Sequence, residues 1–177
     1  MNRPNETEYA PYFQSYVNQV SETDILHVMR AQVDDLDVLL ERVAPEKETY
    51  RYAEDKWSIR EIVGHLIDGE RVFGYRAFSI ARGEQQSLPG FDQDEYMLTA
   101  PYNNIELEDL LSELRLVRLG NIAMFRTLDE ESWNRVGTAN ENQVSVRAIA
   151  FIMAGHLRHH MNVLRERYLA NASFQPA

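Results

Sequence analysis

The chain of 177 residues is 44% hydrophobic and 26% charged, a composition typical of a globular protein of about one domain whose core needs no disulfides. Its formal net charge of −10 disfavours nucleic-acid binding, because a phosphate backbone normally recruits clustered lysine and arginine. The lack of cysteine excludes a thiolate nucleophile from the protein itself, and no stretch is apolar enough to span a membrane. We therefore expect a cytoplasmic protein that uses histidine and carboxylate chemistry.

The first expected helix runs from residue 24 to residue 43. Apolar residues recur there at helical spacing, and the preceding segment Ser21–Asp24 resembles a capping box with a hydroxyl at the N-cap. Pro45 should end this helix, because proline cannot continue the helical hydrogen bonding.

The second expected helix, residues 59 to 82, begins at a regular capping box. Ser58 supplies the N-cap hydroxyl and Glu61 the carboxylate three residues later. Gly83 is a candidate C-cap. A connection of 22 residues, 83 to 104, follows; it contains Pro89 and Pro101, and its length suits a crossover along the bundle or a functional lid.

Two more helices are expected in the second half of the chain. Asn103 should cap a helix that ends near residue 125, and Ser145 should cap one that runs from residue 146 to about 169. The segment between them, 128 to 144, is expected to be a loop that can hold a short extended pair. These elements predict an all-α four-helix bundle with long inter-helix loops over residues 20–170, between an N-terminal extension, 1–19, and a tail, 171–177.

The histidines of the fourth helix are the most informative residues for function. His156 and His160 are four residues apart on the side of the apolar stripe, whereas His159 lies at its flank. An inward i, i+4 pair can present two nitrogens to one divalent metal, and His65 on the second helix is a candidate third ligand. Three neutral imidazoles suit a catalytic zinc-type site, and they also suit nickel or iron.

Each of these residues also has a structural interpretation. The three inward histidines can be hydrogen-bonded core residues, and His27 lies at the flank of its own helix. Asp68, one turn after His65, can either orient that imidazole or lie in solvent. Glu61 already serves the capping box, so no catalytic residue is assigned.

Two segments together resemble a known family, the DinB/YfiT-like superfamily of metalloenzymes. They are Lys56-Trp-Ser-Ile-Arg-Glu-Ile-Val-Gly-His65-Leu-Ile-Asp68 and Ala154-Gly-His156-Leu-Arg-His-His160. The resemblance implies a four-helix bundle that holds zinc or nickel on His65, His156 and His160, frequently as a homodimer. Characterised relatives include thiol-dependent S-transferases.

The resulting expectation is a metal-dependent enzyme of the thiol S-transferase or hydrolase type that acts on a small molecule, for which a low-molecular-weight thiol is a candidate. In the transferase reaction the sulfur must come from the cosubstrate, because the chain has no cysteine. The alternative is a non-catalytic bundle that binds a metal, a ligand or a partner. Phe13, Tyr16, Phe91 and Tyr96 are apolar residues at the ends and loops that can serve a dimer interface or cover the bundle.

Overall fold

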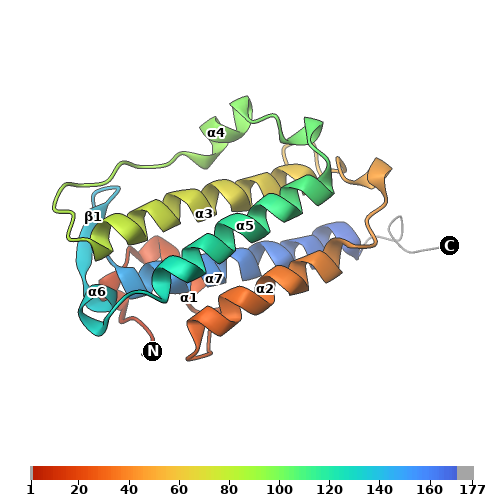
Figure 1. Ribbon diagram of the computed structural model, residues 1–177. Helices are drawn as coiled ribbons and strands as arrows, with labels where there is room; N and C mark the ends of the chain where they lie inside the picture. Colours follow the sequence, from red (N-terminus) through yellow and green to blue (C-terminus); the bar gives the residue numbers. More distant parts are fainter. Residues whose placement is uncertain (1, 171–177) are drawn as a thin grey trace.

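Four long helices form a bundle in the computed structural model, which describes residues 2–170 (Figure 1). They are α2 (Ile25–Leu40), α3 (Ile59–Ala81), α5 (Leu107–Phe125) and α7 (Val146–Val163). A π-helical turn, Leu164–Leu169, extends α7. The expected all-α four-helix bundle is therefore confirmed, and the expected tail, 171–177, lies outside the described residues.

The smaller elements lie in the connections. They are α1 (Gln14–Val17), α4 (Gln93–Thr99), α6 (Glu130–Asn134), β1 (Val136–Ala139) and β2 (Asn142–Ser145), with 3₁₀ turns at Glu6–Glu8, Pro11–Phe13, Pro45–Lys47 and Tyr102–Asn104. The two strands form an antiparallel hairpin, which is the extended pair expected before α7. Helix α6 was not expected; Asp129 caps it by accepting from the Ser132 N–H.

Helices α3 and α5 are neighbours that run in the same direction. Arg60 at the start of α3 pairs with Glu106, and Asn121 near the end of α5 donates to the Glu70 carbonyl oxygen. A parallel step requires a connection as long as the bundle, and residues 83–104 return along it (Figure 1). This connection was expected to contain no regular element, but it includes α4, because Asp92 caps that helix by accepting from two backbone N–H groups.

The expected caps agree with the structure at three positions. Ser58 and Glu61 form the capping box of α3, and Ser145 caps α7 by accepting from the Ala148 N–H. Gly83 has a φ of +90°, and the N–H groups of Gly83 and Glu84 close a Schellman motif on α3.

Two other expected caps are wrong. Asp24, rather than Ser21, caps α2 by accepting from the His27 N–H. Asn103 does not cap α5, which starts only at Leu107, because the Asn103 side chain is engaged elsewhere. It accepts from the Ser58 hydroxyl over 2.6 Å and donates to Glu61 over 2.8 Å.

The residues before 20 pack on the bundle. Helix α1 lies against α7, and a Cβ atom at Gly155 would overlap the carbonyl oxygen of Tyr16, so only glycine permits this approach. Glu8 accepts from the Ser145 hydroxyl and pairs with Arg147. These contacts bring the N-terminal aromatic residues to the bundle wall near His156.

The bundle interior contains a buried ion pair. Arg118 of α5 is 0% exposed and lies 3.0 Å from a carboxylate oxygen of Glu70 on α3. Arg118 also donates to Gln32 of α2 and to the Met153 carbonyl oxygen of α7, each over 3.3 Å. The Arg118 side chain thus links all four helices, and it contacts α7 one turn before His156.

None of the helices in residues 2–170 has the length and apolarity that a membrane span requires.

Candidate metal centre

Three histidines from two antiparallel helices converge in the bundle. His65 of α3 faces His156 and His160 of α7, and one ligand nitrogen of each lies within 4.8 Å of the others. The Nε2 atoms of His65 and His156 are 2.9 Å apart. Trp57, next to the N-cap of α3, packs its ring 4.7 Å from that of His65. The residue before the N-cap of α3 therefore forms one wall of the histidine cluster.

Burial keeps these imidazoles neutral. Burial, with a smaller contribution from the neighbouring His159, lowers the pKa of His65 to about 4. Burial also lowers the pKa of His156 and His160 well below the ordinary histidine value, with contributions from the other cluster histidines. A neutral imidazole has a free nitrogen lone pair, which is the form that binds a metal ion.

The donor set fits a divalent metal. The Nδ1 atom of His160 is buried and has no hydrogen-bond partner among the described residues, as expected for a nitrogen whose partner is a metal. Tetrahedral ligands at the usual zinc–nitrogen distance lie about 3.3 Å apart, and the three nitrogens lie within 4.8 Å of one another. The described cluster contains no carboxylate, so its three imidazoles would leave a coordination position free.

The other polar residues singled out from the sequence lie outside the cluster. His159 packs its ring 5.4 Å from that of Tyr16, at the flank of α7. Asp68 accepts from the Tyr102 hydroxyl over 2.7 Å, so this contact, rather than orientation of His65, occupies it. Glu61 pairs with Arg51 besides capping α3, which leaves it a structural role.

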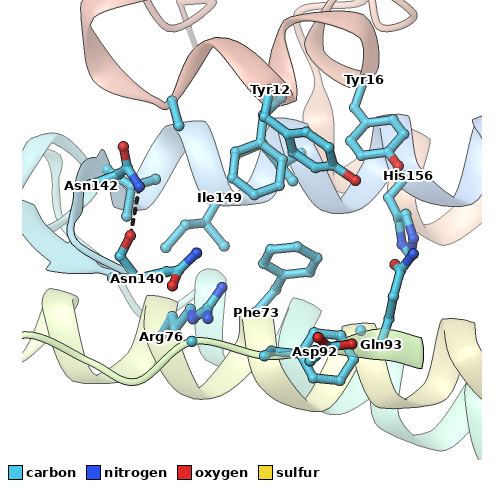
Figure 2. Close-up of a pocket in the computed structure, with 18 of the residues that line it drawn as sticks. Tyr12, Tyr16, Phe73, Arg76, Asp92, Gln93, Asn140, Asn142, Ile149 and His156 are labelled. Atoms are coloured by element: carbon cyan, nitrogen blue, oxygen red, sulfur yellow. Dashed lines mark hydrogen bonds between the residues drawn. The ribbon is translucent and has the colours of Figure 1, made fainter. Parts of the chain in front are cut away.

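A cavity of about 780 Å³ opens beside the histidine cluster, and His65 and His156 form part of its lining (Figure 2). Its other lining comes from the N-terminal residues, α3, the 83–104 connection, the β1–β2 hairpin and α7. The aromatic members are Tyr12, Phe13, Tyr16, Phe73, Phe91 and Tyr96. A cavity with apolar walls and a few polar groups is the usual form of a small-molecule site.

Sequence reasoning missed most of this lining. Phe73 and Arg76 lie within the expected second helix but were not singled out, although Arg76 lies eleven positions after His65 and therefore on the same face of α3. Phe91 and Tyr96, which were named from the sequence as candidates for a dimer interface or for covering the bundle, pack their rings 4.8 Å apart in the cavity wall. The polar hairpin residues Asn140 and Asn142 gave no periodic signal.

Comparison with known proteins agrees with this geometry. Residues 29–164 match the family model of the DinB superfamily. A protein of Oceanobacillus iheyensis named putative metal-dependent hydrolase is 26% identical over 115 residues, which cover 62% of this chain and 64% of that protein. The match thus spans less than two thirds of the relative's length.

A solved structure has the same fold. YfiT from Bacillus subtilis, described as a probable metal-dependent hydrolase with an unusual four-helix bundle topology, aligns with a TM-score of 0.71 at 16% identity. The alignment covers 93% of this chain and 90% of that chain. At this identity the likeness demonstrates the bundle fold.

Proposed function

Since this chain belongs to the DinB superfamily, we propose that it is a metal-dependent hydrolase of a small molecule, with His65, His156 and His160 as its metal ligands. The observation that carries the proposal is the convergence of three neutral imidazoles, two of which, those of His65 and His156, line an open cavity. The names of the two similar proteins support the hydrolase class.

The chain's own residues have three tasks in this reaction. The three imidazoles would hold zinc or nickel, both of which accept nitrogen ligands. When bound, such an ion supplies a Lewis acid and lowers the pKa of a water molecule. The aromatic walls of the cavity would orient the apolar part of the substrate and exclude bulk water.

The test begins with metal analysis of protein purified without an affinity tag, followed by turnover assays on a panel of esters and amides with and without a low-molecular-weight thiol. Stoichiometric zinc or nickel and hydrolysis in the absence of thiol support the proposal. Turnover only in the presence of thiol would show the S-transferase instead. Full metal occupancy without any turnover of the panel would favour the non-catalytic bundle.

The 83–104 connection should determine substrate affinity. Replacing both Phe91 and Tyr96 by alanine removes an aromatic pair from the cavity wall, so we expect kcat/KM to fall about 2- to 10-fold while metal occupancy stays unchanged. Leu98→Ala is the matched control, because Leu98 lies on the same helix α4 and is 86% exposed. Loss of stability with unchanged kcat/KM per folded molecule would show that the pair only anchors the loop.

The homodimer remains a prediction that rests on the family resemblance. Phe13, Tyr16, Phe91 and Tyr96, which were candidates for a dimer interface, all line the cavity within one subunit. We expect sedimentation at micromolar concentration to give about twice the 20.6 kDa mass of one chain. A mass near that of one chain would contradict it.

A further inference from the structure

Arg76 is a buried arginine that lines the cavity and has no carboxylate partner among residues 2–170. The residue is 7% exposed, and its one hydrogen bond within the described residues goes from Nη2 to the Pro89 carbonyl oxygen over 2.8 Å. A guanidinium has five N–H donors, and a buried cation is normally paired with an anion. Arg76 therefore has donor capacity that the protein leaves unused.

Arg76 and the histidine cluster lie on one face of α3. Eleven residues separate Arg76 from His65, which corresponds to three helical turns within about 20°. Gly69, whose Cα lies next to the His156 ring, is seven residues before Arg76 and therefore about 10 Å away along the helix axis. Figure 2 shows Arg76 and Asn140 at one end of the cavity and His156 at the other.

The surroundings of Arg76 suit an anionic group attached to an apolar body. Its guanidinium carbon lies 5.9 Å from the centre of the Phe73 ring, in the cavity wall. Asn140 and Asn142 of the hairpin add amide groups at this end. The wall also contains the carboxylates of Asp92 and Glu95, and one Asp92 oxygen already accepts from two backbone N–H groups at the start of α4.

We propose that Arg76 binds the negatively charged group of the substrate, and that the substrate is a small carboxylate with an apolar or aromatic body. Its carboxylate would pair with Arg76 while its reacting bond lies at the histidine end of the cavity. The placement of the reacting bond at the histidines rests on the proposed function. The binding of the carboxylate by Arg76 does not, because it requires neither a metal nor turnover. Arginine is suited to the task because its planar fork can donate two parallel hydrogen bonds to a carboxylate.

The competing explanation is structural. In this explanation Arg76 only holds the 83–104 connection in place, since Pro89 follows Leu88, whose backbone pairs with Thr138 of β1 and with Asn140. If Arg76 only holds the connection in place, its replacement should change the affinities for charged and neutral ligands equally. The comparison of a carboxylate with its amide therefore separates the two roles.

The experiment measures the affinities of 4-phenylbutyrate and its neutral amide, 4-phenylbutyramide, by titration calorimetry on the protein as purified, with metal content determined on the same samples. We expect the wild type to bind the carboxylate about 10- to 100-fold more tightly than the amide, as charge-assisted hydrogen bonds predict. Arg76→Gln should bring the ratio close to one. Arg82→Gln, the control with the same change of charge at an exposed position of the same helix end, should retain the wild-type ratio.

Arg76→Lys keeps the positive charge but lacks the planar guanidinium, so it should retain part of the preference for the carboxylate over the amide. It also provides a second variant if Arg76→Gln does not fold. A preference that survives in Arg76→Gln would place the carboxylate elsewhere, for example on a metal, and would overturn the proposal. Equal binding of acid and amide by the wild type, or no carboxylate binding at millimolar concentration, would also overturn it. If the variants lose affinity for the carboxylate and the amide in parallel, with an unchanged ratio of the two affinities, Arg76 only holds the connection in place.

Discussion

Replacing His160 by alanine should deprive the protein of its metal, whereas replacing His159 by alanine should leave the metal in place. His160 belongs to the cluster of three imidazoles and has a buried Nδ1 atom without a partner, while the His159 ring packs on Tyr16 at the flank of α7. Loss of one of three protein ligands should weaken metal binding more than about 100-fold, since even residues that only orient a ligand change affinity 10- to 100-fold.

The measurement is metal content after dialysis, together with the affinity for zinc and nickel from competition with a chelator. His156→Ala should behave like His160→Ala, because each histidine supplies one nitrogen to the cluster. Circular dichroism controls for unfolding. Similar metal loss in the His159 and His160 variants would contradict the assignment of His160, rather than His159, as a ligand. Full metal retention in the His160 variant would show that His160 is not a ligand.

The second large effect concerns the buried ion pair of Arg118 and Glu70. Arg118→Leu would leave the Glu70 carboxylate buried without its cation, and we expect the free energy of unfolding to fall by about 3–5 kcal/mol. That is a large fraction of the stability of a domain, about 5–15 kcal/mol. Urea denaturation at neutral pH measures the change.

Two variants test the cause. The double variant Arg118→Leu with Glu70→Leu should recover much of the loss, because no charge then remains buried. Arg115→Leu is the matched control on the same helix: its partners Asp34 and Asp37 are partly exposed, so the expected loss is below about 1 kcal/mol. Equal losses for Arg115→Leu and Arg118→Leu would contradict the explanation.

The pH dependence of the Arg118 variant has a defined sign. Burial raises the pKa of Glu70, so the folded state retains a proton at a higher pH than the unfolded chain does. Removal of Arg118 should raise this pKa further. Stability is lost as pH rises through a raised folded-state pKa, so the deficit of Arg118→Leu relative to wild type should shrink as pH is lowered from about 7 towards 5.

Sequence reasoning succeeded where structure depends on residues close in the chain. The capping box of Ser58 and Glu61 and the C-terminal motif at Gly83 involve groups within five residues, so their residue types suffice to predict them. The spacing of His156 and His160 is likewise a local property, because one helical turn places them on one face. Their convergence with His65 agrees with the family resemblance.

Local reasoning failed where a distant group competes for the same side chain. Asn103 has the right type and position to cap α5, yet Ser58 and Glu61, more than forty residues earlier in the chain, bind its amide. The length of the 83–104 connection permitted either direction for the next helix. Contacts between α3 and α5, such as that of Asn121 with Glu70, determine the parallel arrangement.

The amino-acid sequence by itself determined the four long helices, most of their ends and the three histidines, because these depend on periodicity and neighbouring residues. Only the tertiary structure decided the cavity and the environment of Arg76. Five segments of the chain supply the cavity wall. Arg76 is distinguished because folding buries it beside Pro89 without an acidic partner among the described residues. Burial and the lack of a counter-charge depend on which segments pack together, and a residue's type and spacing do not encode them.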